Sequence, residues 1–423
     1  MIDLLKNFDE FVAIERNIIA KQLRFYRNKI GVIKEWNDRE MELFLYKNGK
    51  LISFSVENPD RKKVREGLEK AERTMRHVPE MPFKLGKRCK YINNKYFDRK
   101  IVDDETILKE ADKAIRKSLQ YGEETAGVLY AIKENLKIEN SKGVYCEDIN
   151  SMAYLSVRVN SKNQSFHSVS CSRRIDGLGK KIFSEEEILK DSQKQKTVKE
   201  GKYDVLFTPL AFANLISYFS NFSSAFAVDS GYSFLENKIG KKIASECVTI
   251  YDSGIERDGI FSRKFDDEGV STQKTVVVDN GILKTYLHNS TTALKYNCET
   301  TGNAGIISPH PWNTVIKEGN YKINEIIEDS RDILLITNLW YTRFHNYKTG
   351  DFSTVARDAS FHIKNGEVLE NVKGIRISDN MERILKNVSF LSKEKKQIYW
   401  WEVENAVFSP YAFVKDVCIT TAI

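Results

Sequence analysis

The sequence has few of the residues and spacings from which metal sites are usually built. Its 423 residues include six cysteines with no CxxC pair, and six histidines, no two of which are three to five residues apart. The scattered cysteines exclude a zinc ribbon and a disulfide framework, and they are typical of a reduced, intracellular protein. The histidine spacing excludes HExxH and HExxxH, in which two histidines on one helical face hold zinc beside a glutamate that activates water.

Motifs for other catalytic chemistries are also missing. There is no GxSxG elbow, no SxxK pair and no GxxxxGK[ST] phosphate loop, and the run GLGKKI at 177–182 lacks the third glycine of GxGxxG. His167 and Cys171 lie four residues apart in FHSVSC, which we expect to be a strand. Four strand residues span about 13 Å, so the two side chains could not share a metal ion and we expect a structural role for them.

Charge of one sign is not concentrated in any segment. The 66 lysines and arginines exceed the 59 acidic residues by only seven, and the two signs are interspersed. This pattern favours a mixed, solvated surface over a nucleic-acid footprint, which normally shows clustered basic residues. The opening MIDLLKNFDEF is acidic and has no long apolar run, which argues against a signal peptide. We therefore expect a cytoplasmic protein.

One uncharged run is long enough to cross a bilayer and needs a separate interpretation. Residues 205–228 contain no charged side chain, but they include Pro209, two asparagines and four serines, and they follow the strand-like YDVLF. This polar content predicts a buried strand and helix of a soluble core rather than a membrane span.

Hydrophobic periodicity predicts an α+β fold with two small mixed α/β domains followed by a large β-rich domain. The expected domains are 1–100, 101–200 and 201–423. Asn48-Gly49 suits a tight turn between two apolar-rich strands. Asp60 is expected to cap a helix. The apolar face of that helix comprises Val64, Leu68, Ala71 and Met75.

The acidic run FDDEG at 265–269 could supply three carboxylates to a divalent ion. Consecutive acids on a strand or turn point in different directions, however. We therefore expect this segment to be a solvated loop.

Three segments of the C-terminal half resemble the TldD/PmbA family. Residues 262–304 contain the family's arginine with an F-D-D-E-G run, then a strand, N-G-x-L and a T-G-N turn. Residues 340–385 contain its T-G-D-F-S and N-G-E elements, and SFLENKIGKKIAS at 233–245 is similar to its S-F-L-x-x-x-x-G-x-x-I/V stretch. The order and the spacing of these elements agree, whereas the first 190 residues fit only in outline.

The resemblance implies one subunit of a two-subunit peptidase. TldD-type chains carry HExxxH on a helix shortly before the S-F-L stretch and act as zinc metallopeptidases, and TldE/PmbA-type chains are homologous partners without the motif. Here the equivalent helix, within 209–222, has no histidine or glutamate, and residues 404–415 lack the cysteine ligand of TldD-type chains. The resemblance therefore implies a non-catalytic TldE/PmbA-type subunit, inactive alone and without a cofactor, that forms a heterodimer with a zinc-holding TldD-type chain.

Such a heterodimer would degrade or process unfolded and short peptides, with this chain closing one side of a chamber. A strand-rich domain suits that role because an extended peptide can add its backbone to a sheet edge. The residues expected to face the chamber or the partner are Arg343, Thr349, Asp351 and Ser353. A turn held by Asp and Thr hydrogen bonds is the alternative for this group. The aromatic residues expected at the subunit contact are Trp400, Trp401 and Phe408, with core packing as their alternative.

Two other functions stay open at this point. A modulator that binds DNA or a topoisomerase would show clustered basic residues and salt-sensitive DNA binding. An independent hydrolase could have moved its active site, for example to the acids at 266–268 with His288. It would hydrolyse peptides without a partner.

Overall fold

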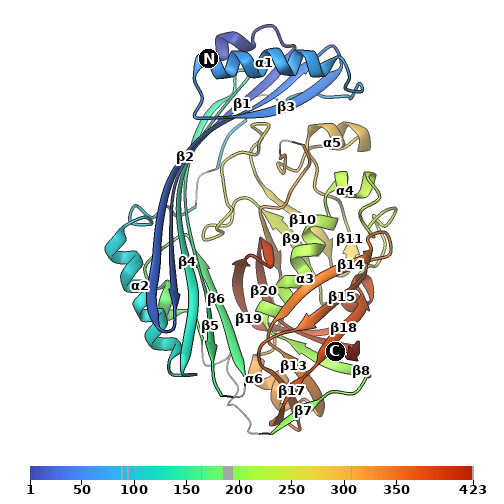
Figure 1. Cartoon of the computed structure of the whole chain (residues 1–423). Helices are drawn as coiled ribbons and strands as arrows, with labels where there is room; N and C mark the ends of the chain where they lie inside the picture. Colours follow the sequence, from blue (N-terminus) through green and yellow to red (C-terminus); the bar gives the residue numbers. More distant parts are fainter. Residues whose placement is uncertain (87–88, 93–94, 163, 184–193, 306, 422–423) are drawn as a thin grey trace.

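The computed structural model describes residues 1–86, 89–92, 95–162, 164–183, 194–305 and 307–421. Across these residues the chain forms two β-sheets with short helices packed on them (Figure 1). In the C-terminal half, strand residues outnumber helical ones. This arrangement confirms the predicted α+β class.

The first sheet is built entirely from the N-terminal part of the chain. Its strands, in their order across the sheet, are β3 (Lys50–Glu57), β2 (Lys29–Lys47), β1 (Glu10–Tyr26), β4 (Glu124–Asn140), β5 (Tyr145–Asn160) and β6 (Ser165–Ser172). The helices of this part are η1 (Ile2–Leu5), α1 (Arg61–Met75), α2 (Asp104–Ser118) and η2 (Leu178–Lys180). All neighbouring strands are antiparallel.

This first sheet runs without interruption across the boundary expected near residue 100. β1 pairs with β4 from Val12↔Asn140 to Phe25↔Gly127, so strands from both expected N-terminal domains share one ladder. Their apolar cores are nevertheless separate: α1 packs over β1, β2 and β3, and α2 belongs to a second core with β4, β5 and β6. The division into three domains stays a prediction.

The second sheet contains the strands of the C-terminal half. Its main order is β11 (Ile282–Leu283), β10 (Lys274–Asp279), β9 (Ile250–Ser253), β12 (Asn313–Ile316), β20 (Val403–Thr421), β8 (Gly201–Phe207), β13 (Asp332–Ile336), β16 (Ser360–Lys364), β17 (Glu367–Lys373) and β7 (Gln195–Thr197). The branch that joins β20 comprises β14 (Leu339–Asn346), β15 (Asp351–Ala356), β18 (Ile375–Asn380) and β19 (Val388–Trp400). The helices are α3 (Pro209–Phe222), α4 (Ala225–Asp229), α5 (Ser290–Tyr296), α6 (Ile323–Glu328) and α7 (Met381–Lys386).

Several local predictions are confirmed. The Asn48-Gly49 turn joins β2 to β3, and the Asp60 side chain accepts a hydrogen bond from the backbone of Lys63 at the start of α1. The four apolar residues assigned to the inner face of α1 are buried. The uncharged run at 205–228 forms the end of β8 and the helices α3 and α4, mostly inside the core. No helix among the described residues has the length and apolar character needed to span a membrane.

Arg173, just after β6, joins the first sheet to the C-terminal half. It is fully buried, and its guanidinium donates five hydrogen bonds. Three go to the carbonyl oxygens of Gly259, Ile260 and Ser262 in the C-terminal half, at 2.8–3.2 Å. The others go to the Tyr96 carbonyl and to Asn150 Oδ1 on β5. Backbone carbonyls alone thus satisfy most of the donors of this buried cation.

Replacing Arg173 with methionine should strongly destabilise the protein. The change removes all five donors and leaves buried carbonyl oxygens without a partner, so the free energy of unfolding should fall by about 3–5 kcal/mol. Chemical denaturation measures this directly. The control is Arg116→Met on α2. The Arg116 side chain is 79% exposed, so this substitution should lower the free energy of unfolding by less than about 0.5 kcal/mol. Equal stability of the two variants would contradict the structural role of Arg173.

Candidate functional site

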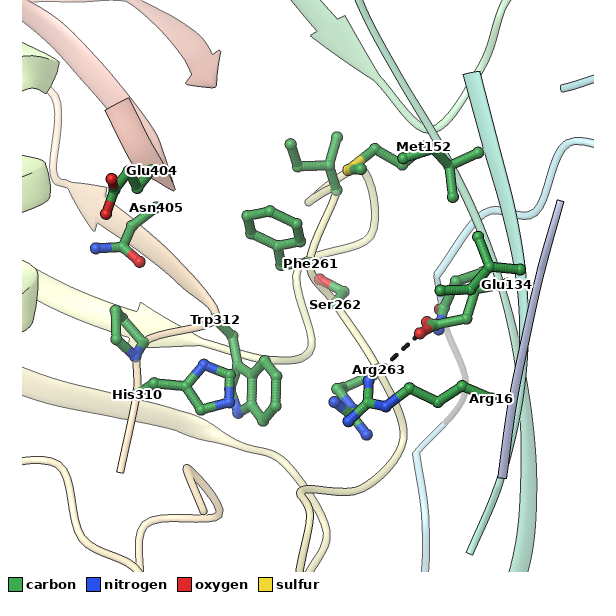
Figure 2. A pocket seen from close by; sticks show the side chains of 15 residues that line it. Arg16, Glu134, Met152, Phe261, Ser262, Arg263, His310, Trp312, Glu404 and Asn405 are labelled. Carbon is green, nitrogen blue, oxygen red and sulfur yellow. Dashed lines mark hydrogen bonds and ion pairs between the residues drawn. The ribbon is translucent and has the colours of Figure 1, made fainter. Parts of the chain in front are cut away.

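A cavity of about 380 Å³ lies between the first sheet and the C-terminal half. We call it the cleft. The first sheet contributes side chains from β1, β4 and β5, and the C-terminal half contributes the segments 260–263 and 310–312 and the start of β20. The residues that line it are Arg16, Ile18, Ile132, Glu134, Asn150, Met152, Ile260, Phe261, Ser262, Arg263, His310, Pro311, Trp312, Glu404 and Asn405. Figure 2 shows Arg16 and Arg263 meeting at one end and Glu404 and Asn405 at the other.

The arginine end of the cleft is a mixed-charge cluster. Arg16 pairs with Glu42 at 3.0 Å, with Glu134 at 3.4 Å and with Asp267 at 3.3 Å. Burial alone would lower the pKa of Arg16, but the three carboxylates outweigh it and raise the pKa overall. Asp267 also lies 3.1 Å from Nη2 of Arg263, so a single carboxylate bridges the two guanidinium groups.

Aromatic rings form the floor beside Arg263. Its guanidinium lies 4.8 Å from the centre of the Trp312 ring, within the range of a cation–π contact. The Trp312 indole N–H donates to the Gly302 carbonyl, which fixes the ring. His310 packs edge-on against Trp312, and burial lowers its pKa to about 4. Its imidazole is therefore neutral at physiological pH and adds no charge to the cleft.

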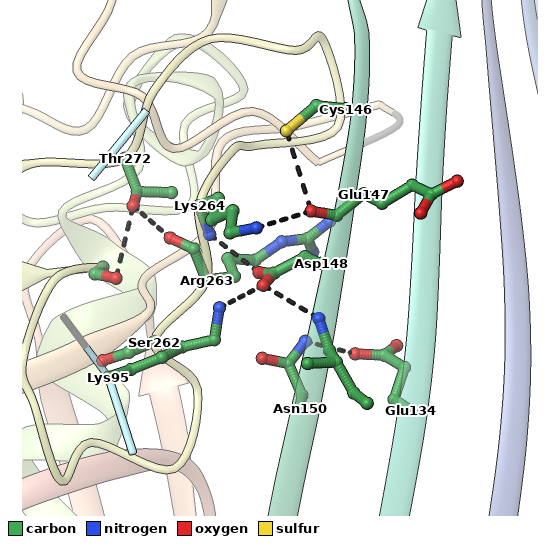
Figure 3. Close-up of polar contacts among 12 residues, drawn as sticks. Lys95, Glu134, Cys146, Glu147, Asp148, Asn150, Ser262, Arg263, Lys264 and Thr272 are labelled. Carbon is green, nitrogen blue, oxygen red and sulfur yellow. Dashed lines mark hydrogen bonds and ion pairs between the residues drawn. The ribbon is translucent and has the colours of Figure 1, made fainter. Parts of the chain in front are cut away.

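A buried network holds the 262–264 segment against the first sheet (Figure 3). Asp148 on β5 pairs with Lys95 and accepts a backbone hydrogen bond from Lys264 at 2.9 Å. Burial lowers the pKa of Lys95 to about 8, against the opposing effect of Asp148. Lys264 Nζ also donates to the Glu147 carbonyl. These contacts set the position of the neighbouring Arg263.

A smaller cavity of about 130 Å³ adjoins the cleft through Glu404. Helix α3 forms one wall with Ser217, Tyr218 and Asn221, and the opposite wall consists of Arg343, Trp401 and Glu402. Asn405 ties this wall to the cleft because its side chain donates to the Ser217 carbonyl and to Asn221 Oδ1. Asn214, one turn earlier on α3, is held by Glu402 and Thr342.

The side chains on this face of α3 do not fit a zinc site. Zinc is bound in proteins by histidine nitrogen, cysteine sulfur and carboxylate oxygen, whereas α3 offers serine, tyrosine and asparagine. Within the described ranges, no three His, Cys, Asp or Glu side chains gather closely enough to hold a metal ion. His167 and Cys171 lie on β6, as predicted, and contact different partners.

The residues expected to face a peptide chamber separate into two places. Arg343 on β14 is exposed in the small cavity, and Ser353, its cross-strand neighbour on β15, is buried. Thr349 and Asp351 lie in the turn between these strands, where the Thr349 hydroxyl donates to Asp351 at 2.5 Å. Asn380 holds the same turn through both residues. This is the hydrogen-bonded turn that the sequence allowed as the alternative.

The three aromatic residues expected at a subunit contact also differ in exposure. Trp400 is buried in the C-terminal core and Phe408 is half-buried on β20, where it lies beside Gln397 of β19. Trp401 is 57% exposed at the rim of the small cavity, with its ring 4.6 Å from that of Trp340. Of the three, Trp401 presents the largest free surface to a partner.

The prediction that the acidic run is a solvated loop is wrong. Asp266, Asp267 and Glu268 are all buried, because each carboxylate finds its own partners. Asp266 accepts three backbone hydrogen bonds, Asp267 pairs with the two arginines, and Glu268 accepts from the backbone and the hydroxyl of Ser290. The three acids do point in different directions, as expected. Burial raises the pKa of Asp266 and of Glu268.

His288 does not complete a catalytic group with these acids. It is buried, its Nδ1 lies 3.2 Å from the Thr292 hydroxyl, and burial lowers its pKa to about 4. The run therefore acts as a set of separate structural anchors, and it forms no acid–base pair with His288.

The residues of the cleft carry little local signal in the sequence. Arg263 falls within a recognisable block, but Arg16, Glu134 and Trp312 belong to no motif. Arg16 and Asp267 are 251 residues apart in the chain. Pairs of positions that vary together among homologues are the signal that would connect such distant segments.

Comparisons with known proteins agree with this geometry. The family described as PmbA/TldA metallopeptidase C-terminal domain matches residues 200–421. The chain is 33% identical over 211 residues to a metalloprotease of Methanocaldococcus jannaschii, a stretch that covers 48% of this chain and 46% of that protein. It is 30% identical over 192 residues to metalloprotease PmbA of Escherichia coli O157:H7, covering 44% and 41%. The chain thus spans about half the length of the curated relatives that it matches.

One solved structure resembles nearly the whole chain. The crystal structure of TldE from Thermococcus kodakarensis has a TM-score of 0.86 and 22% identity, and the match covers 99% of both chains. At this identity the likeness shows a common fold. The family match, by contrast, covers just over half of the chain, and this chain therefore belongs to the PmbA/TldD metallopeptidase family.

Proposed function

We propose that this chain is a non-catalytic, TldE/PmbA-type subunit that pairs with a TldD-type zinc metallopeptidase chain to degrade or process unfolded and short peptides. The observation that carries the proposal is the chemistry of α3. The side chains that it contributes to the small cavity, Ser217, Tyr218 and Asn221, cannot replace histidine and glutamate at a catalytic zinc. The zinc, which would polarise the scissile carbonyl and activate water, is expected on the partner.

The cleft supports a role for this chain in holding peptides. Seven of its fifteen lining residues are apolar and the other eight are polar or charged, so the cleft offers both apolar surface and polar groups that could orient a ligand. It also lies beside the small cavity at α3, so that a peptide in the cleft would reach the exposed face around Trp401 and Arg343. In this proposal, the two chains close a chamber at that face, and the present chain orients the peptide without cleaving it.

Zinc content tests which of the two subunits holds the catalytic metal. The purified chain alone should contain no stoichiometric zinc and should not hydrolyse peptides. Co-expression with a TldD-type chain should give about one zinc per heterodimer, because one HExxxH helix binds one ion. Metal analysis of both preparations gives the answer, with a TldD-type chain lacking its two motif histidines as control. Stoichiometric zinc on the lone chain would refute the proposal.

Trp401 should contribute to the contact with the partner. Truncation of a large exposed aromatic at an interface commonly weakens binding, and Trp401→Ala should raise the dissociation constant of the heterodimer about tenfold or more. Analytical ultracentrifugation or surface plasmon resonance measures the change. The matched control is Tyr145→Ala on β5, an aromatic of similar exposure at 52% and far from α3 in sequence. The placement of the interface is wrong if both variants bind the partner as well as the unmodified chain.

A further inference from the structure

Two arginines, Arg16 and Arg263, line the cleft and a third, Arg173, lies behind its wall, and the three differ in how completely their donors are used. Arg173 donates five hydrogen bonds. Arg16 has three carboxylate partners. Arg263 has one ion-pair partner, Asp267, which it shares with Arg16. Nη2 of Arg263 lies 3.1 Å from Asp267 but, like Nε, makes no well-directed hydrogen bond to the described residues. Arg263 is therefore the cation at the cleft whose donors are least used.

Arg263 is also placed as a binding group would be. Its side chain is only 8% exposed, it lines the cleft, and its guanidinium lies against the Trp312 ring. A buried arginine with unused donors is unfavourable in the free protein, and the arrival of an acceptor relieves that cost. Its planar fork matches a carboxylate in particular. The Asp148 network described above holds the adjacent backbone in place, so little further ordering is required on binding.

The other charges at this end of the cleft favour an acceptor with one negative charge over an acceptor with two. Two arginines face three carboxylates there, Asp267, Glu42 and Glu134. A dianionic phosphate would be repelled more strongly than a monoanion by these acids. Beyond this charged end, the cleft has apolar side chains on both walls, Ile132 and Met152 from the first sheet and Phe261 and Trp312 from the C-terminal half. The pocket thus pairs one carboxylate position with an adjoining apolar volume.

We propose that the cleft binds the C-terminal carboxylate of a short peptide at Arg263, with the apolar side chain of the terminal residue between the two walls. This inference rests on the proposed function, because it names the end of the peptide substrate that this subunit recognises. The chain then extends past Asn405 toward the small cavity and the partner. Arg263 acts here as a binding residue and takes part in no bond cleavage.

Calorimetric titration of two peptides into the full-length chain tests the proposal without any mutation. The peptides are a hexapeptide of five alanines and a C-terminal leucine, as the free acid and as the C-terminal amide. The free acid should bind about tenfold or more tightly than the amide, as expected for a charge-assisted pair. Equal affinities, or no binding of either peptide, would overturn the proposal. Displacement of the free acid by equimolar inorganic phosphate would overturn the carboxylate assignment.

Two variants assign the effect to Arg263. In Arg263→Gln the preference for the free acid over the amide should disappear, and in Arg263→Lys, which keeps the charge but loses the fork, it should be reduced. Arg343→Gln, which changes an arginine of the small cavity, should retain the full preference. A preference unchanged in Arg263→Gln would exclude this residue as the recognition group. Thermal unfolding of each variant verifies folding, and Arg263→Lys provides the comparison if the glutamine variant does not fold.

The outcome is separable from that of the proposed function. Zinc content reports on the pairing of catalytic and non-catalytic subunits, whereas the acid-to-amide ratio reports on this cleft alone. A lone chain that holds zinc yet still prefers the free acid would refute the non-catalytic role and support carboxylate binding at Arg263. A zinc-free chain with no preference for the free acid would support the non-catalytic role and refute carboxylate binding at Arg263.

Discussion

The structure depends on how a buried arginine joins two sheets. Arg173 has no close carboxylate partner and is instead surrounded by carbonyl oxygens from the 259–262 segment and from Tyr96, with one amide oxygen from β5. Because these acceptors come from both sides, the guanidinium holds the first sheet against the C-terminal half, together with an apolar core that draws residues from both. The cleft lies beside this junction, since Ile260 and Ser262 both line it and accept hydrogen bonds from Arg173. The position of Arg263 is set by the same segment.

Sequence patterns were sufficient wherever a feature depends on neighbouring residues. The cap at Asp60, the turn at Asn48-Gly49 and the burial of 205–228 follow from local propensity and periodicity, and all three are confirmed. The prediction for the acidic run at 265–269 was wrong because the burial of these acids depends on donors distant in the sequence, such as Ser290 and Arg16. The resemblance to the TldD/PmbA family identified the C-terminal half, but it could not reveal a cleft whose other wall is the N-terminal sheet.

Under the function proposed above, one fold would serve two roles through the side chains of one helix. Relatives with a similar C-terminal half are described as metalloproteases, while α3 in this chain carries no group that zinc prefers. Asn214 of α3 instead donates a hydrogen bond to the Glu402 carbonyl, and Asn405 of β20 donates one to the Ser217 carbonyl of α3. The polar groups of α3 thus tie the helix to the neighbouring strands.

The separation of Arg16 and Asp267 by 251 residues also bears on how the protein is made. During synthesis β1 leaves the ribosome long before Asp267, so Arg16 has for a time only Glu42 and Glu134, the carboxylates of its own sheet, as ion-pair partners. Contacts of such long sequence separation form late in folding. The cleft is accordingly among the last features of the chain to be completed, and a nascent chain stopped before residue 267 has no binding site to offer.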